Sequence, residues 1–519
     1  MKPQRENWST KLGVVLAVAG SAVGLGNFLR FPAKVTLNGG GAFMIPYFVA
    51  LLLLGIPLMW TEWALGRFGG AHGHGTAPGI LHKVTRRPYA SFFGIFALVG
   101  PFLILTYYTY IESWTLAYAW FAFSGQLLED ATQDGMKKFL AVYQGITSGE
   151  SPGLSSAYIF FVITFIINMT IVHRGIQGGI EKFNKIAMPL LVLLATFLMI
   201  RVLSLGTPDP SQPELSINNA LGFIWNADLN ALSSAKVWLE AAGQVFFTLG
   251  VGIGVILTYA SYTKKDDDVV LSGLVASSTN EFCEVILGGS IVIPAAFVFF
   301  GAAGAVAIAE GGLFNMSFVS MPLIFAKLPF GSFFCGLWFL LLFVAAVTSV
   351  VSLLQPGIAF LCDELKLSRG KAVSIIGLIL FICCQPLIFF IGRGVIDEID
   401  FWGGTFFLVI FALIEVVAFM WVFGGERAWN EINRGAYIKL PRVFYVILKY
   451  VTPVYILILL VSWSWQQLGP VLRMEGVPEE NKIYLWGVRV FVVALLVVAC
   501  ALIARMNRRM PPLGEDYET

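Results

Sequence analysis

Charged residues are scarce in this sequence. Only 13% of the 519 residues are Asp, Glu, Lys or Arg, whereas 57% are hydrophobic and the mean hydropathy is +0.78. Because soluble globular domains carry about a quarter charged residues, the composition excludes an ordinary soluble domain. It predicts a multi-span membrane protein that resides in a lipid bilayer. The net charge of +2 is too small to indicate a nucleic-acid partner.

Signatures of covalent chemistry are also missing. The six cysteines lie in or beside apolar runs, so we expect no structural disulfide. The histidines flank loops, and His72 and His74 in GGAHGHG are too sparse for a metal site. With no phosphate-binding loop and no nucleophile motif, we predict that the chain is not an enzyme and does not use ATP itself. The apolar run from Leu12 to Leu16 is shorter than a signal peptide needs, so we expect a retained N-terminus.

Long apolar runs, by contrast, are abundant. A bilayer is crossed by about 20 mostly apolar residues, and this rule predicts twelve transmembrane helices. They lie near 11–37, 41–70, 88–124, 157–173, 182–204, 235–262, 269–302, 332–365, 371–391, 399–424, 443–465 and 484–505. Two connections are long, 125–156 and 303–331, and we expect the second to fold into short helices.

Basic residues mark every second connection. They precede span one, follow spans two, four, six, eight and ten, and end the chain. Because cytoplasmic loops carry an excess of Lys and Arg, this pattern predicts that both termini are cytoplasmic. We therefore expect a multi-pass protein of the cell inner (plasma) membrane.

Glycine clusters interrupt the first and sixth spans. Residues 17–32 contain Gly20, Gly24 and Gly26 beside Asn27, and 247–254 read FTLGVGIG. Interrupted spans at matching positions of two halves indicate inverted repeats with a midplane site. The alternative is that these glycines only permit close helix packing.

The repeat defines seven segments. We predict a cytoplasmic tail 1–10, a first five-helix repeat 11–204 and an extracellular connection 205–234. A second, inverted repeat 235–424, a cytoplasmic loop 425–442, two additional helices 443–505 and a tail 506–519 follow.

Several polar residues fall inside predicted spans. Ile104 and Tyr108 share a helix face, as do Asn280 and Glu284, and an ionisable residue at membrane depth is a functional candidate by default. In span eight the face is formed by Ala345, Thr348, Ser349 and Leu353, whose hydroxyls suit a small hard cation. The alternatives are a core tyrosine, a structural or protonated glutamate, and hydroxyls that bond their own helix.

Opposite charges also occur at both ends of the spans. Arg30 and Asp400 lie at outer ends, and Arg5 and Asp363 lie at inner ends. Such pairs could serve as gates, or they are ordinary interfacial charges that snorkel.

These residues resemble the neurotransmitter:sodium symporter family. The matching stretches are SAVGLGNFLRFP (21–32), NGGGAFMIPY (38–47), GQVFFTLGVGIG (243–254), TYASY (258–262), TSVVSLLQP (348–356), DELKLSR (363–369) and DEIDFWGGT (397–405). The resemblance implies an all-α polytopic membrane protein with the leucine-transporter fold, a 5+5 inverted repeat with broken helices 1 and 6. It also implies sodium-driven amino-acid uptake with two Na+ ions.

The resemblance assigns ligands to both ions. The first site is expected to use the carbonyls of Ala22 and Thr248 and the side chains of Asn27, Thr248 and Asn280, completed by the substrate carboxylate. The second is expected to use the carbonyls of Gly20, Val23 and Ala345 with the hydroxyls of Thr348 and Ser349. Because all these ligands are neutral, binding of the anionic substrate group and of the cation should stabilise each other.

The same resemblance places the substrate. Amides of Gly24, Leu25 and Gly26 and the Tyr108 hydroxyl would bind its carboxylate. Residues expected around its amino group and side chain are Ala22, Ile104, Tyr108, Phe247, Thr248, Gly250, Ile253, Ser349 and Leu353. Because this wall is uncharged, we predict neutral hydrophobic amino acids. Gly250 and Ile253 replace larger Ser and Phe of the family's leucine-transporting members, so we expect leucine-like substrates and room for larger, aromatic ones.

Further expectations concern ions and gates. Glu284 would substitute for the chloride of chloride-dependent relatives, which predicts chloride-independent transport. Arg30–Asp400 would be the outer gate, and Arg5–Asp363 with Trp8, Ser261, Tyr262 and Gln355 the inner one.

The predicted function is a Na+ symporter that works by alternating access. An amino-acid sensor without net transport and a proton-coupled transporter are the alternatives. The lack of cysteine in 125–156 favours a bacterial source, and the sequence leaves a homodimer open.

Overall fold

The computed structural model describes residues 7–147, 149, 152–312 and 314–510. Within these residues the chain is helical throughout and has no strand beyond one isolated bridge between Gly40 and Ala227. Continuous helices satisfy their backbone groups inside their own segments, which the bilayer interior demands. The prediction of an all-α polytopic protein is therefore confirmed.

Ten continuous helices are long and apolar enough to cross a membrane among the described residues. The first five are Gly41–Ala71 (α3, Gly41–Ala50; α4, Ile56–Ala71), Pro88–Phe123 (α6, Phe96–Phe123), α8 (Leu154–His173), Ile176–Leu203 (α9, Lys182–Leu203) and Val269–Glu310 (α13, Val269–Glu281; α14, Gly289–Glu310). The next three are Gly331–Glu364 (α16, Gly331–Leu353; α17, Gln355–Ala359), α18 (Arg369–Phe389) and Val395–Asn433 (α19, Val395–Asp400; α20, Phe407–Val417; α21, Gly425–Asn433). The last two are Val443–Arg473 (α22, Val443–Val446; α23, Thr452–Trp463; α24, Gly469–Arg473) and α25 (Glu479–Asn507).

The two remaining predicted spans are broken. The first consists of α1 (Lys11–Ala22) and α2 (Leu25–Leu37), which meet at a bend of 47°. The sixth consists of α11 (Ala235–Leu249) and α12 (Val255–Ala260), separated by residues 250–254. Neither piece of the sixth is long enough to cross a membrane alone. The count of twelve spans therefore stays a prediction, while both predicted interruptions are present.

Short helices fill the connections. They are α5 (Ala77–Thr85), α7 (Gln133–Tyr143), α10 (Ile217–Trp225), and a π-helical turn Asn315–Ser320 followed by α15 (Met321–Ala326). The last two confirm the expected short helices in 303–331. Helical structure also extends beyond the apolar runs. The seventh span reaches Glu310 through a kink at Gly301, and α21 occupies part of the predicted loop 425–442. The length of an apolar run predicts which part of a helix lies in lipid. It does not predict where the helix ends, because backbone hydrogen bonds continue in polar segments.

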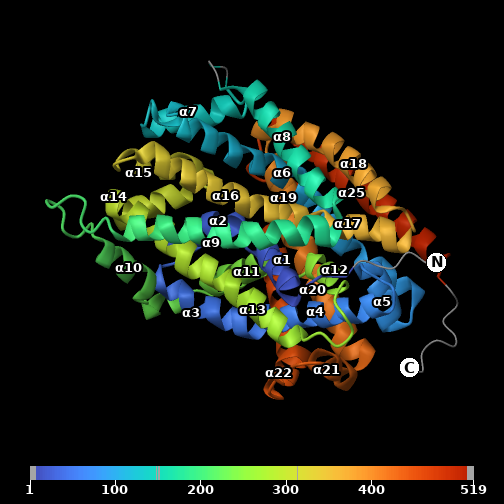
Figure 1. Ribbon diagram of the computed structural model, residues 1–519. Helices are drawn as coiled ribbons and strands as arrows, with labels where there is room; N and C mark the ends of the chain where they lie inside the picture. Colours follow the sequence, from blue (N-terminus) through green and yellow to red (C-terminus); the bar gives the residue numbers. More distant parts are fainter. Residues whose placement is uncertain (1–6, 148, 150–151, 313, 511–519) are drawn as a thin grey trace.

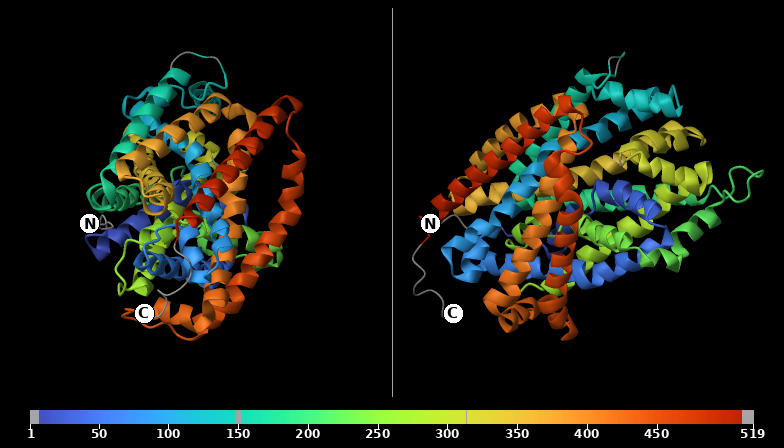
Figure 2. Two further views of the ribbon diagram at one scale, coloured as in Figure 1. Left: turned by 90° about the vertical axis from the view of Figure 1, so that its right-hand side faces the viewer. Right: turned by 180° about the vertical axis from the view of Figure 1, so that it is seen from behind.

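The broken helices lie in the middle of the bundle. In Figure 1 α1, α2, α11 and α12 are surrounded by the other helices, and α1 packs against α9, α13 and α16. In Figure 2, α23 and α25 run along the periphery, and both have mostly exposed apolar surfaces. That these two spans are additional to the repeat stays a prediction.

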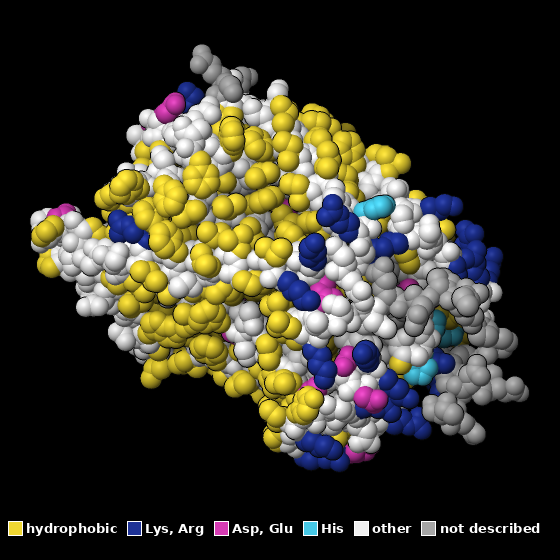
Figure 3. Space-filling model, viewed as in Figure 1, with side chains coloured by type: hydrophobic (Ala, Val, Ile, Leu, Met, Phe, Trp, Pro, Cys, Tyr) yellow, Lys and Arg dark blue, Asp and Glu magenta, His cyan; other side chains and the backbone are white. Residues whose placement is uncertain are grey.

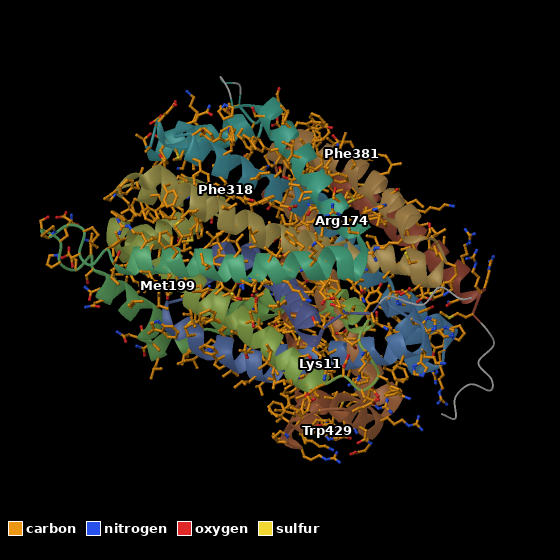
Figure 4. The ribbon with its side chains drawn as sticks, in the orientation of Figure 1. Lys11, Arg174, Met199, Phe318, Phe381 and Trp429 are labelled. Atoms are coloured by element: carbon orange, nitrogen blue, oxygen red, sulfur yellow. The ribbon has the colours of Figure 1, made fainter. Side chains whose placement is uncertain are left out.

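Charge is segregated along the molecule. Figure 3 shows hydrophobic side chains in a broad zone and Lys and Arg gathered at the end that carries α5 and α21. In Figure 4, Phe318 and Met199 lie in the apolar part, and Trp429 lies on α21 at the basic end. A bilayer around the apolar zone would place the basic residues in one aqueous phase.

Candidate substrate and sodium site

Two interruptions in helical backbone create the site. Between α1 and α2, Val23 and Gly24 have extended backbone angles. After α11, Gly250, Gly252 and Gly254 have φ values of 64°, 80° and 83°, which glycine adopts without strain. The last carbonyls of α1 and α11 and the first amides of α2 and α12 thus lose their helical partners. These groups face one another because α2 packs against α11.

A chain of buried polar side chains links the two breaks. The Gly24 amide donates to Asn27 Oδ1 at 2.9 Å, and Asn27 Nδ2 donates to Asn280 Oδ1 at 2.8 Å. Asn280 Nδ2 in turn donates to Thr248 Oγ1 at 3.0 Å. The structure therefore brings together the three side chains predicted for the first sodium site, and all three are buried. Their oxygens are the neutral hard ligands that suit sodium.

Glu284 closes this network. The Thr248 hydroxyl donates a short hydrogen bond to Glu284 Oε2, and Gln244 Nε2 donates to Oε1 at 2.5 Å. The carboxyl group is fully buried and has both oxygens bonded. A negative charge one hydrogen bond away from Thr248 would favour a cation at the neutral ligands.

Gln244 was not among the predicted residues. It lies one helical turn before Thr248 on α11 and shares its face, so the i,i+4 spacing was a signal that could have identified it.

Part of the predicted second sodium site comes together. Ser349 Oγ lies 3.2 Å from the Ala345 carbonyl and 3.5 Å from the Ser21 carbonyl, and Thr348 Oγ1 donates to Ala345 at 2.8 Å. A Cβ added to Gly20 would lie 3.3 Å from Thr348 Cβ, so α1 and α16 touch here. The hydroxyls do bond their own helix, as the alternative interpretation holds. Ser349 nevertheless also approaches the Ser21 carbonyl at the end of α1.

Tyr108 and Phe247 line a vestibule beside the broken first span. The Leu25 amide donates to the Tyr108 hydroxyl at 3.0 Å, and a Cβ on Gly24 would lie 3.0 Å from that hydroxyl and 2.7 Å from Ser349 Oγ. Phe247 lies beside Gly26, where an added Cβ would meet its ring at 2.6 Å. A cavity of about 500 Å³ opens above these residues.

Not every residue of the predicted side-chain wall lines this vestibule. Ile104 is buried on α6, and Ile253 approaches Gly250, whose added Cβ would lie 3.9 Å from its Cδ1. Leu353 lines a different, apolar cavity, with residues of α6, α18 and α25. Of the residues predicted to surround the substrate side chain, Tyr108 and Phe247 line the vestibule.

The charges of the predicted outer gate line the same vestibule without touching. Arg30 lies over the Phe247 ring, 4.1 Å from its centroid, and Asp400 accepts a hydrogen bond from the Tyr107 hydroxyl at 2.5 Å. Among the described residues, no ion pair within 4.0 Å joins Arg30 to Asp400. The cavity of about 500 Å³ therefore lies between these two charges.

The opposite side is closed. Trp8 is 7% exposed, and its Nε1 donates to the Tyr259 carbonyl at 2.9 Å while its amide donates to the Tyr262 carbonyl. Gln355 Nε2 reaches the Tyr262 hydroxyl at 3.4 Å. Arg369, which was not predicted, donates to Gln355 Oε1 at 3.3 Å. Arg5 lies outside the described residues, so its predicted pairing with Asp363, which follows α17, stays a prediction.

Known proteins resemble this chain along most of its length. Residues 5–134 and 129–508 match the model of the sodium:neurotransmitter symporter family. An uncharacterised sodium-dependent transporter of Methanocaldococcus jannaschii is 34% identical over 456 residues, covering 84% of this chain and 86% of the relative. One from Bacillus subtilis is 30% identical over 401 residues, covering 77% and 82%. The crystal structure of MhsT in complex with L-phenylalanine has a TM-score of 0.75 at 30% identity, covering 88% of this chain and 100% of that chain.

Proposed function

The chain belongs to the sodium:neurotransmitter symporter family, and from this premise we propose that it imports neutral hydrophobic amino acids together with two Na+ ions. The family is one of sodium-coupled membrane transporters, so the protein is not an enzyme. The proposal places it in the inner membrane with both termini in the cytoplasm.

The observation that carries the proposal is the polar chain between the broken helices. Asn27, Thr248 and Asn280 converge from three spans onto the break, and Glu284 supplies the nearby negative charge. A zwitterion whose carboxylate reaches this point would add an anionic ligand to the cation. Sodium and substrate would then stabilise each other's binding, and this coupling is what a symporter needs.

Backbone amides would hold the substrate carboxylate. Gly24, Leu25 and Gly26 lie at the start of α2, where amides lack helical partners and the helix dipole favours an anion. The Tyr108 hydroxyl, already bonded to the Leu25 amide, can rotate to donate to the same carboxylate. This arrangement recognises what all amino acids share and leaves selectivity to the side-chain wall.

The wall supports hydrophobic substrates. Ile104, Phe247 and Ile253 offer no charge to an acidic or basic side chain, which would lose its hydration without a partner. Gly250 leaves open space, since a Cβ there would meet nothing closer than 3.9 Å. MhsT was crystallised with L-phenylalanine. We therefore propose that substrates range from leucine-like to aromatic amino acids.

Alternating access accounts for the asymmetry of the two sides. The vestibule above Tyr108 and Phe247 is open, whereas Trp8 and Gln355 seal the other side. Binding would draw Arg30 toward Asp400 and loosen the inner contacts. A carboxylate at Glu284 would make transport independent of chloride.

Uptake into proteoliposomes tests the proposal. Labelled leucine should accumulate under a sodium gradient and should not accumulate under a proton gradient or with no gradient. Thr248→Val should abolish sodium-dependent uptake. Thr61→Val is the matched control, because Thr61 is equally buried and bonds only its own helix at Pro57.

Three results would refute the proposal. Accumulation driven by protons alone would favour the proton-coupled alternative. Sodium-dependent binding without accumulation would favour a sensor. Competition by charged amino acids equal to that by leucine would overturn the assigned substrate class.

A further inference from the structure

A buried amide oxygen lies against the last turn of α1. Asn184 belongs to α9 and is 1% exposed. Gly20 has no side chain, and a Cβ placed on it would lie 2.3 Å from Asn184 Oδ1 and 3.3 Å from Thr348 Cβ. The amide oxygen and Thr348 of α16 therefore approach the same point on α1 from two different helices. α9 runs beside α1 and α16 in Figure 1, and the three helices pack against one another.

The helix of Asn184 holds this amide in one orientation. Asn184 Nδ2 donates to the Ile180 carbonyl at 2.9 Å. A carbonyl only accepts hydrogen bonds, so the amide must present its NH2 group to Ile180. Turning the amide over would bring two acceptor oxygens together. Its oxygen is therefore directed toward the backbone of Gly20.

The same oxygen lacks a hydrogen-bond donor. Within the described part of the chain, no donor reaches Asn184 Oδ1. Besides this oxygen, the atoms nearest to the point on Gly20 are the Met188 sulfur and Thr348 Cβ, and the Thr348 hydroxyl donates to the Ala345 carbonyl. A buried polar atom without a partner destabilises the fold, so its presence in a native protein indicates an ion or a water.

The groups around this oxygen attract a cation. α1 ends at Ala22, and the carbonyls in the last turn of a helix carry partial negative charge. Thr348 and Ser349 bring two hydroxyl oxygens to the same turn, and Ser349 Oγ lies 3.5 Å from the Ser21 carbonyl. Carbonyl, hydroxyl and amide oxygens are neutral ligands, and a hard cation takes several of them at once.

The carboxylate nearest along α9 is already satisfied. Glu181 lies one turn before Asn184, and it accepts hydrogen bonds from the Ser9 amide and the Thr10 hydroxyl, both at 2.9 Å. It also pairs with Lys185 at 2.7 Å. Among the described residues, no group of three or more His, Cys, Asp or Glu could hold a metal ion. Neutral oxygens without a free carboxylate suit a monovalent cation better than a divalent one.

We propose that Asn184 Oδ1 is an additional ligand of the sodium ion at the second site. The inference rests on the second sodium site of the proposed function and adds a residue that the family resemblance did not indicate. All the ligands expected at that site come from the first and eighth spans, so Asn184 would connect α9 to the ion as well. Sodium would then hold three helices together instead of two.

Sodium titrations of Tm test the inference on the full-length protein in detergent. Choline replaces sodium at constant ionic strength, and no amino acid is present. Asn184→Ala removes the oxygen, whereas Asn184→Asp keeps an oxygen and adds a negative charge. Asn168→Ala is the matched control on α8. Asn168 is also buried, its Nδ2 donates to Glu112 at 2.8 Å, and its Oδ1 likewise lacks a donor among the described residues.

The three variants should respond differently. Asn184→Ala should raise the sodium concentration at the midpoint of the Tm rise about 10-fold to 150-fold, the range for a lost polar contact with a charged partner. Asn184→Asp should have a lower Tm without sodium, because it buries a carboxylate without a counter-charge, and should need less sodium than the original chain. The control should lower Tm at every sodium concentration and leave the midpoint unchanged.

Two results would overturn the inference alone. One is an Asn184→Ala protein with the midpoint of the original chain, which would show that the oxygen bonds a structural water. The other is an equal shift of the midpoint in Asn168→Ala, which would show a general effect of lost packing. Both leave the sodium response of the original chain intact. If the Tm of the original chain did not respond to sodium, the proposed function would be overturned together with this inference.

Discussion

Gly26→Ala should weaken substrate binding without unfolding the protein. Gly26 is the second residue of α2 and lies beside the ring of Phe247, and a Cβ there would lie 2.6 Å from Cε1 and 3.1 Å from Cδ1 of that ring. Ordinary contact begins at 3.4 Å, so the ring must retreat by roughly 0.8 Å. Arg30 lies 4.1 Å from the centre of the same ring and restricts where it can go.

The new methyl group should raise the free energy of the closed, substrate-bound state more than that of the open state. While the vestibule is open, the ring can swing toward the cavity of about 500 Å³ and relieve the clash. Closure over the substrate would force the ring back against the new methyl group. Overpacking of this kind costs about 1–3 kcal/mol, and because 1.4 kcal/mol is a factor of ten, Kd should rise about 5-fold to 150-fold.

Equilibrium binding of labelled leucine in sodium measures the effect. Gly100→Ala on α6 is the matched control, because its Cβ would meet nothing closer than 3.5 Å. We expect the control to bind as the original chain does, and both variants to unfold at similar temperatures without substrate. A Gly26→Ala protein with an unchanged Kd would refute the idea that Phe247 closes against this glycine.

Three further perturbations have defined outcomes. Thr248→Val removes the hydroxyl between Asn280 and Glu284, so the sodium concentration needed to raise Tm should increase about 10-fold to 150-fold, since a lost hydrogen bond to a charged group contributes about 1.5–3 kcal/mol; an unchanged sodium response would contradict the first ion site. Replacing chloride by gluconate should leave uptake unchanged, whereas Glu284→Gln should make it depend on chloride; strong chloride dependence of the original chain would contradict the role of this carboxylate. Trp8→Phe removes the bond to the Tyr259 carbonyl at a cost of about 1–3 kcal/mol, which should lower Tm by about 1–3 °C in a chain of this length, while an unaltered Tm would show that this contact does not stabilise the inner side.

The interruptions were predictable because glycine has a local physical effect. Gly250, Gly252 and Gly254 adopt positive φ in the structure, and no other residue would do so at low cost. Asn27, Thr248 and Asn280 could likewise be singled out, since polar side chains inside apolar runs need partners. Their mutual hydrogen bonds were not predictable from spacing, because they join spans whose packing depends on the whole bundle.

Other residues of the site were not predicted from the sequence. Gln244 shares a helix face with Thr248 and could have been singled out, but its bond to Glu284 and that of Arg369 to Gln355 join different segments and depend on the fold. The ends of spans were misplaced for a different reason. α21 continues a helix past Gly424 although its residues are polar, because backbone hydrogen bonding does not need an apolar surface.

The sequence alone determined that this is a helical membrane protein with two broken spans, because hydropathy and glycine act within a few residues of the chain. Only the tertiary structure decided which side is open and which residues meet. Arg30 lies over Phe247 and Asp400 bonds Tyr107, although the charges of Arg30 and Asp400 alone suggested a pair. Arg67 likewise pairs with Glu431, 364 residues later in the chain, only because distant segments pack together. Contacts of this kind depend on the packing of whole helices, which no single stretch of sequence encodes.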